Sequence, residues 1–244
     1  MTAILVTRPQ PDATATAQRL EAIGITPVIA PVLTMRPLPC VLPRPDAVAA
    51  LAVTSANALR ALAHHAALGP YFDLPLFAIG DRTAQLAMDL GFTSVVSANG
   101  GLTELVDAIA ATRFAKPIFY PAPRHQAGDL GKLLAPTGQE VVVARVYDMV
   151  AAHALPDAGL QALTRGDLDA VLLYSRRTAE IFATLAEPVL TPPERERLFM
   201  LCLSEAVAAP LLERRFPRIG LAEHPSEDAM IALALSFSRE KNGP

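Results

Sequence analysis

The chain has 244 residues, of which 52% are hydrophobic and 18% are charged, and its formal net charge is −3. This composition excludes a disordered chain, and the length is enough for two domains of modest size. The slightly acidic balance provides no global basic field for nucleic acid or an anionic membrane surface, so any anion-binding site has to be local.

Short apolar strands alternate with amphipathic helices along the chain. In order, strands are expected at Ile4–Val6, Pro27–Leu33, 51–54, 76–79, 95–96, from Ile118 and at Val141–Val150, with helices after Asp12, Asn57 and Asp81 and over 103–111; further strand and helix units cover 168–185, 198–216 and 219–235. This alternation predicts an α/β fold whose doubly wound parallel sheets have right-handed crossovers.

The sequence predicts no export signal, membrane span or metal site. The opening MTAILVTRP enters a strand directly, and no apolar run reaches the roughly 18 residues of a membrane span. Cys40 and Cys202 lie in unrelated contexts, and the pair His64 and His65 is better explained as cations near a helix C-terminus than as ligands. We therefore expect a cytoplasmic monomer with no metal and no nucleic-acid or membrane partner.

The first half of the chain recurs in the second half. ILVTRP at 4–9 and TPVIAPV at 26–32 recur as IFYPAP at 118–123 and EVVVARV at 140–146, both 114 positions later. Further along, ALAVTSANALRAL corresponds to AVLLYSRRTAEIF, and PLFAIGDRTAQLA corresponds to LFMLCLSEAVAAP. Two long copies predict paired domains, and the length of Val141–Val150 suggests a strand that crosses between them.

Polar residues gather at the turns that lead from a strand into a helix, here called elbows. The elbow arginines are Arg8, Arg82, Arg124, Arg176 and Arg177. Helix N-termini carry a positive partial charge, so arginines there indicate an anion that completes the site. Any one of them taken singly more often extends into water, but together they predict a polyanionic ligand.

The absence of several common motifs argues against nucleotide binding of the usual kinds and against hydrolase chemistry. The sequence has no phosphate-binding loop, no dinucleotide fingerprint and no G-x-S-x-G elbow. Ser55 and Ser175 follow strands but have no partner histidine. Each is expected to be a helix N-cap or a ligand donor and not a nucleophile.

The order and spacing of ILVTRP, VTSANA, FAIGDRTA, ARVYDM and YSRRTAEIF across the chain resemble the uroporphyrinogen-III synthase family. The resemblance implies an enzyme of haem biosynthesis that closes the linear tetrapyrrole hydroxymethylbilane, with loss of water and reversal of ring D through a spiro intermediate, and without a cofactor. It also implies two domains that exchange opening units: 1–33 with 151–244, and 40–146, joined by hinge strands at 34–39 and 147–150.

The same resemblance assigns roles to residues. Tyr147 would be the general acid, although the sequence without the resemblance favours a half-buried strand residue at this position. The expected substrate-binding residues are Arg8, Ser55, Asn57, Gly80, Thr83, Arg124, Ser175, Arg176 and Ser204. Thr83 also fits the first helical turn without any ligand, and Ser204 would replace a hydroxyl that is missing at Ala206.

One alternative of a different class stays open at this point. A noncatalytic two-domain protein could sense a polyanionic metabolite on the same scaffold, because a fold alone does not establish a function. The imperfect second copy, with Leu203 in place of Gly80, favours this alternative. Tyr147 favours the enzyme.

Overall fold

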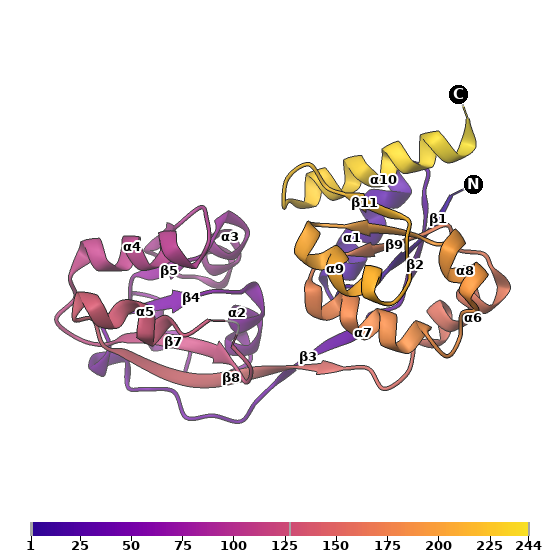
Figure 1. Cartoon of the computed structure of the whole chain (residues 1–244). Helices are drawn as coiled ribbons and strands as arrows, with labels where there is room; N and C mark the ends of the chain where they lie inside the picture. The colour runs from indigo at the N-terminus through magenta and orange to yellow at the C-terminus, as the bar shows by residue number, and fades with distance from the viewer. Residues whose placement is uncertain (1, 127, 244) are drawn as a thin grey trace. The chain divides into compact units, whose positions relative to one another are not determined.

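The structure, a computed structural model, describes residues 2–126 and 128–243 and divides into two compact units. Unit 1 comprises Met1–Thr34 and Val150–Pro244, and unit 2 comprises Met35–Met149. Each unit has its own sheet, covered by helices (Figure 1). Met1 and Pro244, at which the predicted discontinuous domain begins and ends, lie outside the described residues.

Unit 1 has a five-stranded parallel sheet in the order β11-β10-β9-β1-β2. Its strands are β1 (Ala3–Val6), β2 (Thr26–Ile29), β9 (Ala170–Leu173), β10 (Phe199–Cys202) and β11 (Ile219–Leu221). Its helices are α1 (Asp12–Ala22), α6 (Asp157–Arg165), α7 (Arg176–Ala186), α8 (Pro192–Arg197), α9 (Glu205–Glu213) and α10 (Glu227–Asn242).

Alternate residues of these strands enter two separate cores, one on each face of the sheet. Leu5 packs with Phe182 of α7 on one face, whereas Ile4 packs with Leu20 of α1 and Met230 of α10 on the other. Figure 1 shows α7 and α10 on opposite sides of this sheet. A parallel sheet buried on both faces explains why its strands are continuous apolar runs in the sequence.

Unit 2 has a six-stranded sheet in the order β3-β8-β7-β4-β5-β6. Its strands are β3 (Leu33–Pro37), β4 (Ala50–Val53), β5 (Leu76–Ala78), β6 (Val95–Ser97), β7 (Ile118–Pro123) and β8 (Val141–Ala151). Its α-helices are α2 (Ala56–Ala63), α3 (Asp81–Leu90), α4 (Leu102–Thr112) and α5 (Leu130–Leu134), and its 3-10 turns are η1 (Pro45–Ala47), η2 (Gly69–Tyr71) and η3 (Ala135–Thr137).

The sheet of unit 2 also separates two cores. Leu51 lies in one core with Leu59 of α2, and Ala52 lies in the other with Ile109 of α4. Strands β4 to β8 pair in parallel. The predicted α/β class with doubly wound parallel sheets is therefore confirmed.

Both sheets follow one plan, in which the opening strand pair of each copy joins the other copy. β1 pairs with its neighbour β2 and with β9 from the second half of the chain. In the same way β7 pairs with β8 and with β4 from the first half. The sequence repeat and the sheet topology therefore divide the chain at different places.

The strand predicted over Pro27–Leu33 is wrong in its extent, because β2 ends at Ile29 and a new strand, β3, begins at Leu33. Pro31, between the two strands, has no N–H to donate to a ladder. The amides of Ala30 and Val32 still donate to the backbone carbonyls of Val6 (2.9 Å) and Thr7 (3.1 Å), respectively. The chain then joins the second sheet, in which β3 pairs with β8.

Candidate functional site

The predicted site residues lie where the parallel strands end, at what we call the carboxyl edge of each sheet. In open α/β sheets this edge is where ligands bind. Unit 1 contributes Arg8, Ser175, Arg176 and Ser204, and unit 2 contributes Ser55, Asn57, Gly80, Thr83, Arg124 and Tyr147.

Tyr147 lies within β8, level with Pro123 at the end of β7. Its side chain is 4% exposed and packs in the core that contains Leu59. Burial raises the pKa of the Tyr147 phenol, a hydrogen bond with the Ser55 side chain partly offsets that rise, and nearby Tyr120 adds a small further increase. At neutral pH Tyr147 is therefore a neutral hydrogen-bond and proton donor.

Ser55 has a second, structural role. It is the N-cap of α2, and its Oγ accepts a hydrogen bond from the amide of Asn57 at 3.2 Å. Beside it, the Thr54 Oγ1 and Tyr120 Oη atoms lie 3.1 Å apart. The end of β4 thus adjoins a cluster of four hydroxyl-bearing residues in unit 2, Thr54, Ser55, Tyr120 and Tyr147.

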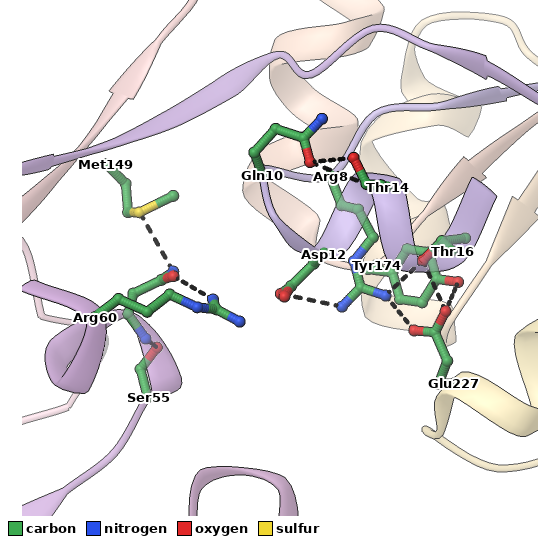
Figure 2. A network of polar contacts seen from close by, with 11 residues as sticks. Arg8, Gln10, Asp12, Thr14, Thr16, Ser55, Arg60, Met149, Tyr174 and Glu227 are labelled. Carbon is green, nitrogen blue, oxygen red and sulfur yellow. Dashed lines mark hydrogen bonds and ion pairs between the residues drawn. The ribbon is translucent and has the colours of Figure 1, made fainter. Parts of the chain in front are cut away.

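Asn57 connects the first turn of α2 to β8 and to a cation. Its Nδ2 lies 3.6 Å from the Met149 sulfur, and its Oδ1 accepts a hydrogen bond from Arg60 at 2.8 Å, as Figure 2 shows for the labelled Arg60 and Met149. Sequence reasoning missed Arg60, which lies inside the helix and not at the elbow. Its i, i+3 spacing from Asn57 was the available signal.

Gly80 and Thr83 belong to the elbow between β5 and α3. Gly80 is the N-cap of α3 with an extended backbone, and a Cβ there would meet nothing within 4 Å. Neither space nor backbone strain therefore requires glycine at this position. The Thr83 side chain is 7% exposed, which favours its role in the helix over a contact with a ligand.

Arg124 lies directly beside Tyr147 in the backbone pairing, since its amide donates to the Tyr147 carbonyl at 2.8 Å. Its guanidinium is about half exposed and forms an ion pair with Asp148 at 3.1 Å. Its charge is therefore partly neutralised by the protein.

In unit 1, Arg8 follows β1 and is the most enclosed of the predicted arginines. Its Nη1 donates to Thr16 (3.0 Å) and to Glu227, and its Nη2 to Asp12 (3.4 Å). The guanidinium lies 4.1 Å from the centre of the Tyr174 ring. Figure 2 shows these side chains converging from the elbow, from α1 and from the start of α10.

The elbow after β9 contains Ser175 and Arg176. Ser175 caps α7, accepting from the Thr178 amide at 3.1 Å and lying 2.7 Å from the Thr178 hydroxyl. Arg176 forms an exposed ion pair with Glu180 at 2.9 Å. Arg8, Arg124 and Arg176 thus all have carboxylate partners within the protein, which weakens the argument that elbow arginines by themselves indicate a polyanion.

Ser204 differs from the other elbow serines. It occupies the N-cap position of α9, but its side chain makes no capping hydrogen bond. Ala206 is exposed and has no hydroxyl to offer. The Ser204 hydroxyl is therefore a polar group of this elbow that the helix cap does not use.

A cavity of about 530 Å³ lies elsewhere in unit 1, before the starts of β9, β10 and β11. It is bordered by Asp169, Arg218 and Lys241, and Lys241 is ion-paired with Asp169 at 2.5 Å. None of the predicted site residues lines it. We therefore place the candidate site at the carboxyl edges and not at this cavity.

Within residues 2–126 and 128–243, no group of three or more His, Cys, Asp or Glu side chains is arranged to hold a metal ion. Burial raises the pKa of the Cys202 thiol to about 12, so this cysteine is an inert core residue. Over the same described residues, no helix is long and apolar enough to cross a membrane.

The chain matches one protein-family model, described as uroporphyrinogen-III synthase HemD, over residues 14–232. Among solved structures, it is similar to uroporphyrinogen-III synthetase from Helicobacter pylori, with 20% identity, a TM-score of 0.69 and coverage of 97% of this chain and 100% of the other. It is also similar to a mutant uroporphyrinogen III synthase from Thermus thermophilus, with 18% identity, a TM-score of 0.55 and coverage of 99% of both chains. A comparison with curated protein sequences gives no match.

Proposed function

Because the chain belongs to the uroporphyrinogen-III synthase family, we propose that it closes the linear tetrapyrrole hydroxymethylbilane to uroporphyrinogen III and that residues at the carboxyl edges of its sheets take part in this reaction. The chain is thus a lyase of tetrapyrrole biosynthesis. The noncatalytic alternative gains no support from the family match or from the similar structures.

The reaction first removes the terminal hydroxyl of ring A as water, which needs one proton and leaves a protonated azafulvene, a cation that regains neutrality when a proton is lost at the end of the reaction. The substituted carbon of ring D attacks the azafulvene carbon and forms a spiro intermediate. The bond between this ring D carbon and the bridge from ring C then breaks, and the bridge carbon bonds instead to the unsubstituted α-carbon of ring D, which loses its proton, so that the macrocycle closes with ring D reversed. The main task of the protein is to hold a flexible polyacid with its two ends together, which lowers the entropic part of the barrier.

Tyr147 is the proposed donor of the proton that departs with the hydroxyl. The observation that carries this role is a buried phenol at the carboxyl edge whose pKa is raised by burial, so that it keeps its proton at neutral pH. Its hydrogen bond with Ser55 favours the phenolate, the form that exists just after the proton has left. Ser55 would then support both helix α2 and the acid.

Three of the other predicted residues, Ser204, Arg124 and Arg176, would act as hydrogen-bond donors to the acetate and propionate groups of the substrate. The hydroxyl of Ser204 and the exposed guanidinium groups of Arg124 and Arg176 suit this role, because carboxylates are bound best by charged or well-oriented donors. The proposed mechanism contains no cofactor. The monomeric state and the cytoplasmic location expected from the sequence stay proposals.

The function is tested by incubating the purified protein with freshly prepared hydroxymethylbilane and separating the oxidised products by isomer. Type III product is expected well above the level formed in buffer. Type I product alone, which forms by spontaneous closure, would overturn the assignment of this reaction to the chain.

A further inference from the structure

Glu227 is the centre of a polar network at the carboxyl edge of unit 1. One of its carboxylate oxygens accepts from the Thr16 hydroxyl at 2.7 Å and from the Tyr174 hydroxyl at 3.2 Å, and the other accepts from Arg8. The Glu227 side chain is 25% exposed. A carboxylate with three donors from three separate segments is held in one orientation.

Arg8 is enclosed by other side chains of the same network. Both of its terminal nitrogens donate to groups of the protein, the side chain is only 12% exposed, and Tyr174 covers one face of the guanidinium. A substrate carboxylate that contacted Arg8 directly would have to displace Glu227 or Asp12 and break charge-assisted hydrogen bonds. The geometry therefore argues against Arg8 as a free receptor for the substrate.

Tyr174 links the network to the adjacent elbow. Burial, followed by the charge of Glu227, raises the pKa of the Tyr174 phenol far above its ordinary value, so the hydroxyl stays a donor to Glu227. The next residue, Ser175, caps α7. Fixing Tyr174 thus fixes the start of the elbow in which Ser175 and Arg176 are proposed to meet substrate.

We propose that Glu227, together with Arg8, Thr16 and Tyr174, is a positioning network that holds the elbows of unit 1 in the geometry that binds the substrate carboxylates. Arg8 then acts through the elbows and does not itself contact substrate. This inference rests on the proposed function. It assigns a role to Glu227, which lies outside the quoted sequence motifs, and to Tyr174, which begins the motif YSRRTAEIF but was given no role there.

The test is the variant Glu227→Gln, which keeps the size of the side chain and removes its charge. We expect the KM for hydroxymethylbilane to rise about tenfold, as for the loss of one hydrogen bond to a charged group, with kcat within about twofold of the wild type. The Kd for uroporphyrin III, measured by fluorescence titration, should rise by a similar factor. The double variant Arg8→Lys with Glu227→Gln should be no worse than the more impaired single variant, because both act through one network.

Asp228→Asn is the matched control. Asp228 follows Glu227 in α10 and forms an exposed ion pair with Arg19 of α1 at 2.7 Å. This variant removes a link between the same two helices without touching Arg8. If the network served only to dock α10 on α1, Asp228→Asn and Glu227→Gln would change thermal stability together and leave KM and Kd unchanged.

Three outcomes overturn the inference: unchanged KM and Kd in Glu227→Gln, additive effects in the double variant, or a rise in KM that occurs in Arg8→Lys but not in Glu227→Gln. The last result would make Arg8 a direct substrate ligand. The porphyrin titration needs no turnover. A wild type that forms no type III isomer would therefore overturn the proposed function, while the titration would still decide on the network.

Discussion

The carboxyl edges of the two units are built from different chemistry, although they derive from copies of one sequence. The edge of unit 1 holds a closed ionic network around Arg8 and Glu227, whereas the edge of unit 2 holds hydroxyl groups around Tyr147 and Ser55. Charged, mutually neutralised groups suit positioning, and neutral phenols suit proton transfer. The roles that we propose therefore assign substrate positioning to unit 1 and proton transfer to unit 2.

The largest effect is expected for Tyr147→Phe, which tests the proposed difference between the two units. This variant removes the phenol hydroxyl and retains the buried ring. We expect kcat to fall at least tenfold with little change in KM, within the range for loss of general acid catalysis. Glu227→Gln should show the reverse pattern. Steady-state kinetics on both variants would separate reaction from binding.

Tyr71→Phe is the control for that change. Tyr71 is another buried phenol of unit 2, but its hydroxyl donates to the Pro43 carbonyl and it belongs to η2, away from the strand ends. The kcat of the Tyr71→Phe variant should stay at the wild-type value. An unchanged kcat in Tyr147→Phe would remove Tyr147 from the mechanism and leave the enzyme assignment in place.

Smaller effects are expected at two elbow serines of unit 1, Ser175 and Ser204, which should respond differently to substitution by alanine. Ser175→Ala should lower the free energy of unfolding by about 1 kcal/mol, because it deletes the cap of α7. Ser204→Ala should barely change stability, since no cap bond is lost, and should raise KM if its hydroxyl meets substrate. Denaturant titration would measure the change in stability, and steady-state kinetics would measure the change in KM. An unchanged KM in Ser204→Ala would contradict a contact between Ser204 and the substrate.

The smallest effect concerns alkaline stability. The pKa values of Tyr147 and Tyr174 are both raised in the folded protein, so the folded state keeps protons that the unfolded state loses above about pH 10. The stabilisation is complete below that pH and is lost as the pH rises further. Unfolding measured at several pH values should show a shallower decline in Tyr174→Phe than in the wild type, and identical slopes would contradict the assigned shift.

Much of the fold could be predicted because its signals are local. Apolar runs, elbows and the repeat were sufficient for the α/β class, and the helix predicted over 103–111 is α4, at Leu102–Thr112. The break at Pro31 was missed because the surrounding residues are apolar enough to suggest one strand. Proline marks such a break only when the ladder it would join is known.

The elbows could be predicted from the sequence, but the contacts of their side chains could not. Strand ends indicated Arg8 and Ser55, since each elbow lies in a short segment with a recognisable pattern, whereas Tyr147 lies inside β8 and was indicated only by the resemblance to the family. One partner of Arg8, Glu227, however, lies 219 positions away in the chain, and no spacing rule connects the two residues. Ion pairing also decides whether an arginine is available to a ligand, and pairing is a tertiary property.

The exchanged strand pairs have a consequence for the order in which the protein is synthesised. Unit 2 lies within one continuous segment, Met35–Met149, so all of it is synthesised before β9 of unit 1. Until then β1 has β2 as a neighbour but lacks β9. β1 therefore has an unpaired apolar edge until β9 is available, and an edge of this kind favours aggregation of the nascent chain.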